Sequence, residues 1–311
     1  MRELNRRRFI GYCAGSATVL GLEAGVLGTL NEALAKKPRR ASAMPRVIWM
    51  AGANCTGCTV SFANLASASS PTDIGDVLLN TVSLDYHPNL MGASGDLAVD
   101  ALTATSNGPY VLVVEGGIPT AMDGATCWLW SDGGVDVTAL EAVSSLAQGA
   151  AAILAVGSCA SFGGIPGGAP NPTGIVPVSQ VTTKPVINIP GCPTHPDWIV
   201  WTIAQLLAAK PIRLDASGRP RQLFSRRIHE TCPFEEGREG HTYGQHLTCL
   251  EELGCRGSRT HADCHLRRWN DGTSWCVEAG AICIGCTENG FPDAMSPFYQ
   301  RENDDDDEYD D

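Results

Sequence analysis

The cysteines constrain this chain more than any other feature, because their spacing is typical of metal ligands. Four of the 13 cysteines lie in short glycine-containing groups, at Cys55-Thr-Gly-Cys58, Gly157-Ser-Cys159 and Gly191-Cys192. Seven more crowd into 55 residues near the C-terminus: Cys232, Cys249, Cys255, Cys264, Cys276, Cys283 and Cys286. An iron–sulfur cube needs four thiolates, or three thiolates and an imidazole. With His229, these eleven cysteines supply three complete sets of four ligands.

Composition excludes some classes of function. The hydrophobic content of 43% supports a sizeable core, and the net charge of −12 argues against nucleic-acid binding, which favours basic surfaces. Eight of the last ten residues are carboxylates, so residues 301–311 are expected to form an acidic tail. Such a run is usually a solvated segment, and the alternative interpretation is a docking site for a basic partner.

The N-terminus has the pattern of a targeting segment. Asn5-Arg6-Arg7-Arg8-Phe9-Ile10 is a twin-arginine signature, and a glycine-rich apolar stretch follows to about Leu34. We predict a twin-arginine signal peptide over residues 1–35, no transmembrane span in the mature chain, and a periplasmic protein that is soluble or peripherally held at a membrane. Because that route exports folded proteins loaded with cofactor, it favours metal ligation over disulfides for the later cysteines. Cys13, inside this segment, is interpreted as inert.

From residue 45 to residue 210 the chain alternates between strand and helix patterns. Apolar strands are expected at 47–51, 110–114, 151–156 and 186–189, and helices from residue 59 to 66, from 137 to 147 and from 198 to 207. This alternation predicts an α/β fold, a flavodoxin-like doubly wound parallel sheet covered on both faces. From 211 to 300 the alternation stops, which predicts a mostly irregular, cluster-binding C-terminal domain that metal clusters would crosslink.

The first ligand set follows from where these strands end. Cys55 and Cys58 come after the first expected strand, Cys159 after the third and Cys192 after the fourth, with Glu115 after the second. Ligands bind at the carboxyl edge of open parallel sheets, so these cysteines are expected to converge there. Glycines allow the backbone to approach an inorganic core closely. A C-x2-C pair alone is equally compatible with a redox dithiol or zinc, but its coupling to two further strand-end cysteines favours a cluster.

The C-terminal region supplies the second and third sets. The second is His229, Cys232, Cys249 and Cys255, for which zinc is the alternative metal because three cysteines and a histidine also bind zinc. The third set is Cys264, Cys276, Cys283 and Cys286. Four other histidines compete for the imidazole position with less persuasive spacing: His241, His246, His261 and His265. Cys127 has no partner motif and is interpreted as a buried structural thiol.

At these residues the sequence closely resembles the small subunit of periplasmic nickel–iron hydrogenases, over nearly its whole length. The segments that carry the resemblance are Cys55-Thr-Gly-Cys58, Glu115-Gly-Gly-Ile-Pro119, Gly157-Ser-Cys159, Pro190-Gly-Cys192-Pro-Thr-His-Pro-Asp-Trp198, His229-Glu-Thr-Cys232-Pro, Leu253-Gly-Cys255-Arg-Gly and Cys283-Ile-Gly-Cys286. The resemblance implies that the first set binds the proximal 4Fe–4S cluster, the third the medial cluster and the second the distal cluster. It also implies an obligate large subunit that carries the nickel–iron site, so this chain holds neither nickel nor a catalytic residue. Glu115 matches a glutamate that faces the large subunit and is a candidate interface or proton-path residue.

The chain departs from the common family pattern at two places. Most members have proline where this chain has Cys276, and three cysteines then hold a 3Fe–4S medial cluster. The fourth thiolate predicts a 4Fe–4S medial cluster, as in the nickel–iron–selenium branch that Pro297-Phe-Tyr299 resembles most, with 3Fe–4S as the alternative. Oxygen-tolerant relatives carry two extra cysteines near the proximal cluster, and Gly57 and Gly164 occupy those positions here. An ordinary cubane is therefore expected.

The resemblance implies an electron-transfer subunit of a heterodimeric hydrogenase. Electrons would pass between the nickel–iron site of the large subunit and an external acceptor through three clusters, during reversible oxidation of H2. A periplasmic multihaem cytochrome c with a lysine-rich surface is the expected acceptor. One rival is the cluster subunit of respiratory NADH dehydrogenase, which lacks the seven-cysteine region and the export leader. The other is a disulfide-stapled secreted binding protein, which the odd number of cysteines disfavours.

Overall fold

A parallel sheet forms the centre of the N-terminal part of the protein. The computed structural model describes residues 44–67, 71–245 and 248–300, so the predicted leader and acidic tail lie outside the described residues. Five strands, β1 (Arg46–Ala51), β2 (Ser83–Tyr86), β3 (Tyr110–Glu115), β7 (Ala152–Val156) and β9 (Val186–Ile189), pair in the order β2-β1-β3-β7-β9. All four pairings are parallel. Counted along the chain, this is the 2-1-3-4-5 order of flavodoxin-like folds, so the predicted fold class is confirmed.

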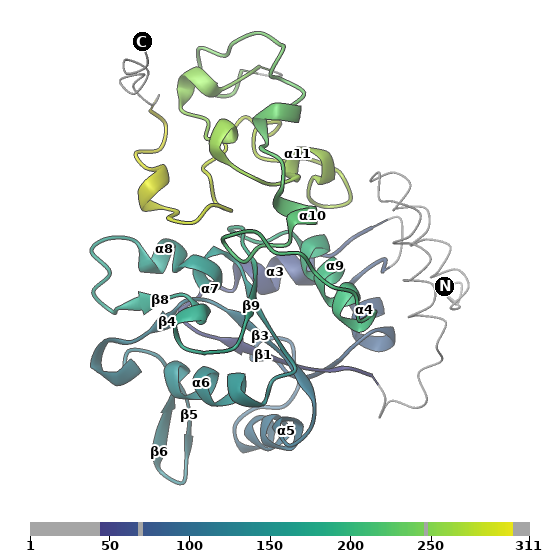
Figure 1. Ribbon diagram of the computed structural model, residues 1–311, viewed down its shortest axis with the longest axis vertical. Helices are drawn as coiled ribbons and strands as arrows, with labels where there is room; N and C mark the ends of the chain where they lie inside the picture. The colour runs from purple at the N-terminus through teal and green to yellow at the C-terminus, as the bar shows by residue number, and fades with distance from the viewer. Residues whose placement is uncertain (1–43, 68–70, 246–247, 301–311) are drawn as a thin grey trace.

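Helices cover both faces of this sheet (Figure 1). On one face, α3 (Gly57–Ala63), α4 (Ile74–Asn80) and α9 (Pro196–Leu207) pack on Val47 and Trp49. On the other, α5 (Asp96–Ser106), α6 (Ala139–Gly149) and α7 (Ser158–Phe162) pack on Ile48 and Met50. Successive residues of a strand point to opposite faces, so a continuous apolar run such as that of β1 is what a sheet buried on both sides requires.

Local sequence signals fix where the helices begin. Thr138 and Glu141 form a capping box at the start of α6, each side chain accepting a hydrogen bond from the other residue's backbone N–H. At α9, Pro196 occupies the first turn, and the His195 ring accepts a hydrogen bond from the backbone N–H of Asp197. These caps fix the entry of the chain into two of the covering helices.

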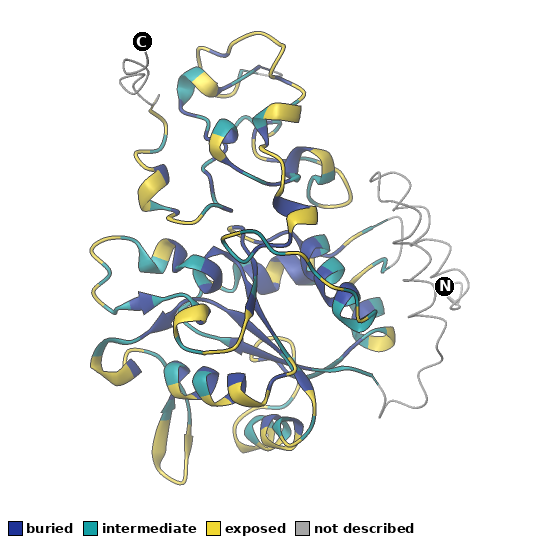
Figure 2. Cartoon of the chain, in the orientation of Figure 1, coloured by how far each residue is buried: buried dark blue, intermediate teal, exposed yellow. Residues whose placement is uncertain are grey.

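The region after residue 210 is built differently. Its described residues form only short helical turns: α10 (Arg221–Phe224), η4 (His229–Thr231), η5 (Glu251–Leu253), η6 (Gly257–Arg259), α11 (Cys264–Arg267) and η7 (Asp293–Met295). The region lies above the carboxyl end of the sheet (Figure 1), and Phe224 packs against Trp198 of α9 with ring centroids 5.0 Å apart. Figure 2 shows buried residues concentrated in the sheet and more exposed residues in this upper region. The predicted irregular C-terminal region is confirmed, while the predicted domain boundaries stay predictions.

The structure corrects several element boundaries. Val137 belongs to a hairpin, β5 (Trp128–Asp132) with β6 (Val135–Thr138), and the helix begins only at Ala139, because the capping Thr138 separates the two elements. Glu115 is the last residue of β3 and does not follow it. The edge strand β2 was missed, since its sequence Ser-Leu-Asp-Tyr lacks an apolar run. A second small antiparallel pair joins β4 (Ile118–Pro119) to β8 (Ile175–Val176).

The remaining short turns are α8 (Gly164–Gly167), η2 (Ala121–Gly124) and η3 (Val178–Gln180). Among the described residues, no helix combines the length and the apolar character needed to cross a bilayer.

His87 provides a test of the packing on the first face of the sheet. Its ring is fully buried and lies tilted against the Trp49 ring, with centroids 5.0 Å apart. Its Nδ1 atom accepts hydrogen bonds from the backbone N–H groups of Asn89 and Leu90. Burial lowers the pKa of His87 from 6.5 to about 4. Between these values the unfolded chain binds more protons than the folded one, so stability is lost as the pH falls from 6.5 towards 4.

We expect His87→Asn, whose side-chain carbonyl can accept the same two bonds, to remove about 3 kcal/mol of this acid destabilisation. Urea midpoints of wild type and variant, measured between pH 4 and pH 7, check this. Equal pH dependence in the two proteins would contradict the assignment.

Candidate metal sites

The carboxyl edge of the sheet brings the first ligand set together. Cys55 and Cys58 lie at the start of α3 after β1, Cys159 lies in α7 after β7, and Cys192 follows β9. The charge of Cys192 acts on Cys58 and Cys159, and Cys55 acts on Cys159 and Cys192. All four are free thiols, and Cys55 and Cys192 are exposed. The convergence predicted from the strand ends is therefore found in the structure.

The thiols of this set are in an environment that opposes ionisation. Burial raises the pKa of Cys58, Cys159 and Cys192, with that of Cys159 at about 12, and the neighbouring thiolates and Glu115 raise it further at Cys58 and Cys159. Thiolates so close together need a compensating positive charge, which a bound metal core supplies. The donor set therefore fits a metal centre, whereas four unbound thiols would not be stabilised by lying so close together.

Glycines surround the sulfur atoms of the first set. A Cβ atom on Gly157, whose φ is +88°, would lie 2.5 Å from the sulfur of Cys58. A Cβ on Gly57 would lie 3.1 Å from the sulfur of Cys55, and one on Gly164 would lie 3.0 Å from the sulfur of Cys159. These three positions keep the space beside the thiols free of side chains.

Glu115 fixes the turn that carries Cys58. Its buried carboxylate accepts hydrogen bonds from the backbone N–H groups of Cys58 and Thr59, both at 3.1 Å. The Trp49 indole donates at 3.2 Å and the Thr59 hydroxyl donates a further bond. Four donors to one carboxylate anchor the start of α3 to the end of β3. The proposed interface or proton-path role of Glu115 stays a prediction.

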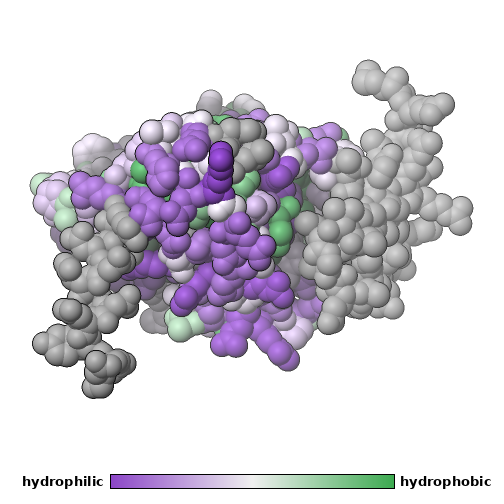
Figure 3. Space-filling model, turned by 90° about the horizontal axis from the view of Figure 1, so that it is seen from above, coloured by the Kyte–Doolittle hydropathy of each residue, from purple (hydrophilic) through white to green (hydrophobic). Residues whose placement is uncertain are grey.

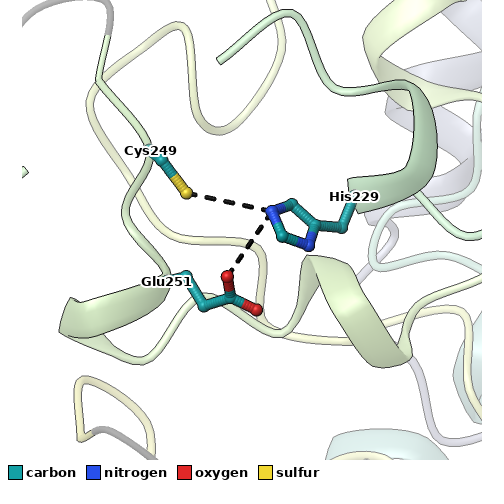
Figure 4. Close-up of side chains that lie close together, drawn as sticks. All are labelled: His229, Cys249 and Glu251. Carbon is teal, nitrogen blue, oxygen red and sulfur yellow. Dashed lines mark hydrogen bonds and ion pairs between the residues drawn. The ribbon is translucent and has the colours of Figure 1, made fainter. Parts of the chain in front are cut away.

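The second ligand set lines one pocket of the C-terminal region. His229, Cys232, Cys249 and Cys255 all face it, together with Glu251. The His229 Nε2 atom lies 3.9 Å from the Cys249 sulfur and 3.5 Å from a Glu251 carboxylate oxygen (Figure 4). Burial raises the pKa of the three thiols, that of Cys255 to about 12. The four predicted members are therefore brought together.

Sequence reasoning missed Glu251, which meets His229 and Cys249 in a geometry able to hold a metal ion. Its position two residues after a predicted ligand was the signal that could have identified it. Among the competing histidines, His261 hydrogen-bonds to Glu288, and His265 hydrogen-bonds to Thr231. His246 lies outside the described residues.

The third ligand set gathers around Cys264 at the start of α11. The charges of Cys286, Cys283 and Cys276 all act on Cys264. Burial raises the pKa of every member, to about 11 at Cys283 and well above the ordinary value at Cys264 and Cys286. As a whole residue Cys276 is exposed, although its thiol is largely shielded from water, whereas Cys264 and Cys283 are buried. Cys276 thus lies near Cys264, and its role as a fourth ligand stays a prediction.

Contacts between the turns that carry the cysteines arrange the three sets in a row. The hydroxyl of Ser158, beside Cys159 of the first set, donates a hydrogen bond to the backbone carbonyl of Cys286, in the third. The backbone N–H of Cys283, in the third set, donates to the sulfur of Cys255, in the second, at 3.3 Å. The third set therefore lies between the other two.

Cys127 takes no part in this arrangement, and one prediction about it was wrong. It is half-buried and not fully buried. It directly precedes the exposed hairpin, whose first residue, Trp128, is 62% exposed. Burial still raises its pKa.

Fold and sites together define a flavodoxin-like protein in which three groups of four nitrogen and sulfur donors form a row. The family described as NADH ubiquinone oxidoreductase, 20 Kd subunit, matches residues 55–206, and the family described as the C-terminal part of the NiFe/NiFeSe hydrogenase small subunit matches residues 224–299. The periplasmic [NiFeSe] hydrogenase small subunit of Desulfomicrobium baculatum is 37% identical, with 96% of this chain and 99% of that protein covered. The hydrogenase-1 small chain of Escherichia coli is 38% identical, with 96% and 80% covered.

Solved structures give the same result. The reduced, active Ni-Fe-Se hydrogenase of Desulfomicrobium baculatum matches with a TM-score of 0.77 and 39% identity, covering 83% of this chain and all of that one. The oxidised recombinant [NiFeSe] hydrogenase of Desulfovibrio vulgaris Hildenborough matches with a TM-score of 0.76 and 39% identity, covering 83% and 98%. The chain belongs to the small-subunit family of nickel–iron and nickel–iron–selenium hydrogenases. Members of this family act as part of a hydrogenase, together with its large subunit.

Gly157 gives a direct test of the first set. An alanine there places its Cβ against the Cys58 sulfur, whereas Gly134 has a similar φ of +84° and nothing within 4 Å of its Cβ. Gly134→Ala controls for a positive φ, while Gly157, with a ψ of 159°, lies in a region of backbone conformation that is essentially confined to glycine. Gly157→Ala should therefore lower the free energy of unfolding by about 1–3 kcal/mol more than Gly134→Ala, from overpacking together with this strain. Urea unfolding followed by tryptophan fluorescence measures the difference, and equal midpoints would show that the Cys58 sulfur has room to move.

Proposed function

We propose that this chain relays single electrons between the nickel–iron site of a hydrogenase large subunit and an external acceptor, through three iron–sulfur clusters. Cys55, Cys58, Cys159 and Cys192 would hold the proximal cluster. Cys264, Cys276, Cys283 and Cys286 would hold the medial cluster, and His229, Cys232, Cys249 and Cys255 the distal one. The observation that carries the proposal is the row of three four-donor sets, joined by the Ser158–Cys286 and Cys283–Cys255 hydrogen bonds.

The chemistry of the donors supports iron–sulfur clusters. When bound, such clusters accept and release one electron at a time. The residues of this chain hold the clusters, set their spacing and exclude water, and hydrogen bonds to the sulfurs tune the potentials. Imidazole is neutral, so His229 in place of a thiolate is expected to raise the potential of the distal site.

The exposed edge of the first set supports docking of the large subunit there. Cys55 and Cys192 are exposed, and two large apolar side chains close to ligand cysteines are more than half exposed, Val60 at 53% and Ile165 at 54%. An apolar surface beside the proximal site is what an obligate interface needs. The nickel–iron site belongs to that partner, and this chain is assigned no nickel.

The second set supports an exit for electrons at the opposite end of the row. Glu235, Glu239 and Glu251 act electrostatically on Cys249, and all three are exposed. Seen from above, the C-terminal region presents a largely hydrophilic face (Figure 3). We propose a periplasmic multihaem cytochrome c with a lysine-rich surface as the acceptor, steered by these carboxylates and by the acidic tail.

The N-terminal pattern supports a periplasmic location reached by the twin-arginine route. Asn5-Arg6-Arg7-Arg8-Phe9 lies outside the described residues, and the Desulfomicrobium relative is named as periplasmic. Clusters would then be assembled before export, in the reducing cytoplasm.

The cluster content is tested on the anaerobically purified heterodimer. We expect about 12 iron atoms in this chain, with matching sulfide and no zinc, because three cubanes each hold four irons. Metal analysis and low-temperature EPR of the reduced protein measure this. Zinc in the second set, or iron well below this value in an intact heterodimer, would reject the three-cluster proposal.

The fourth medial ligand is tested by Cys276→Pro. We expect the wild type to give no 3Fe signal after mild oxidation, and the variant to give a strong one with about one iron atom fewer, because three thiolates hold a 3Fe–4S centre. EPR and iron analysis compare the two proteins. A strong 3Fe signal in the wild type would mean that Cys276 is not a ligand.

A further inference from the structure

Ser158 touches ligand-bearing turns of two different sets. It opens α7 directly before Cys159 and is 1% exposed. Its hydroxyl donates to the backbone carbonyl of Cys286 and accepts from the backbone N–H of Gly191 at 2.9 Å. Its own backbone N–H donates to the Gly191 carbonyl at 3.0 Å. One residue thus fastens the turns of Cys159 and Cys192, from the first set, to the turn of Cys286, from the third.

These bonds are specific to this serine within its helix. Ser161 lies one turn further along α7, is also 1% exposed, and donates its hydroxyl to the Ala155 carbonyl at 3.1 Å. That bond stays within the strand–helix unit to which both residues belong. Burial and residue type are therefore the same at the two positions, and only Ser158 reaches the third set.

The Ser158 bonds hold a ligand of the first set close to a ligand of the third. The charge of Cys192 acts on the Cys286 thiol. Gly191 precedes Cys192, so the hydroxyl that bonds to the Gly191 amide and to the Cys286 carbonyl also fixes how closely these two cysteines approach each other. Electronic coupling falls steeply when a bonded route is replaced by a gap. The position of the Cys192–Cys286 pair therefore governs how well two bound clusters communicate.

We infer that Ser158 is a positioning residue that sets the contact between the proximal and medial clusters, and with it the rate of electron transfer between them. This inference rests on the proposed function. In the step concerned, one electron would pass from the cluster held by the first set, which would be oxidised, to the cluster held by the third set, which would be reduced. The cysteine–iron bonds would stay intact, and no other bond would form or break.

The test uses Ser158→Ala, Ser158→Thr and the control Ser161→Ala in the holoenzyme heterodimer. Ser158→Ala removes both hydroxyl bonds, while Ser158→Thr keeps the hydroxyl. After mixing with H2, rapid freeze-quench EPR follows reduction of each cluster, and the splitting of the reduced spectrum reports coupling between them. We expect Ser158→Ala to slow medial reduction by about tenfold or more and to weaken the splitting, at unchanged iron content, as loss of an outer-shell partner does. Ser161→Ala and Ser158→Thr should match the wild type.

A Ser158→Ala enzyme with full iron content that matches Ser161→Ala in rate and splitting would overturn the inference. If Ser158→Ala does not assemble into the heterodimer, hydrogen exchange on the wild-type holoenzyme tests the inference instead. The bond to the Ser158 hydroxyl should make the Gly191 amide exchange slowly, and fast exchange of that amide would overturn the inference. Failure of the proposed function itself has another signature, since the wild type would then lack the clusters. The two outcomes are therefore distinguishable.

Discussion

Repulsion between buried thiolates is the constraint on which the rest of the structure depends. In each set, burial raises the pKa of at least three thiols, and neighbouring thiolates raise it further. A chain that gathers eleven thiols into three sets would be destabilised unless a cationic core joined the members of each set. Such a core would also stabilise the fold, because the region after residue 210 has only short helical turns to hold its described residues together. We therefore expect folding and metal binding to be linked most strongly in that region.

The parallel sheet brings the cysteine-bearing turns of the first set close together. Strands β1, β7 and β9 are adjacent or nearly so, and each ends at the edge where a cysteine-bearing turn begins. Positive-φ glycines make these turns tight, and the space beside the Cys58 sulfur exists because Gly157 has no side chain. The carboxylate of Glu115, at the end of β3, then anchors the first turn from within the sheet.

Hydrogen bonds between ligand-bearing turns join three separate sites into a row. The third set meets the first where the Ser158 hydroxyl donates to the Cys286 carbonyl, and the second where the Cys283 N–H donates to the Cys255 sulfur. The proposed relay needs its centres to be fixed relative to one another, and these short bonds to the backbone would provide this. In that proposal the large-subunit surface and the acceptor surface would lie at opposite ends of the row.

The sequence by itself determined the α/β class and the strand-end positions of Cys55, Cys58, Cys159 and Cys192, because hydrophobic period and motif spacing are local properties. It also assigned the C-terminal cysteines to two sets whose ligand roles stay predictions. It did not determine the edge strand β2, whose short polar sequence forms a strand only because β1 pairs with it. Nor did it reveal Glu251 beside His229, or Ser158 against Cys286, since residues far apart along the chain meet only after folding. Only the tertiary structure decided these contacts, because each depends on how separate turns pack against one another and on no pattern within any one of them.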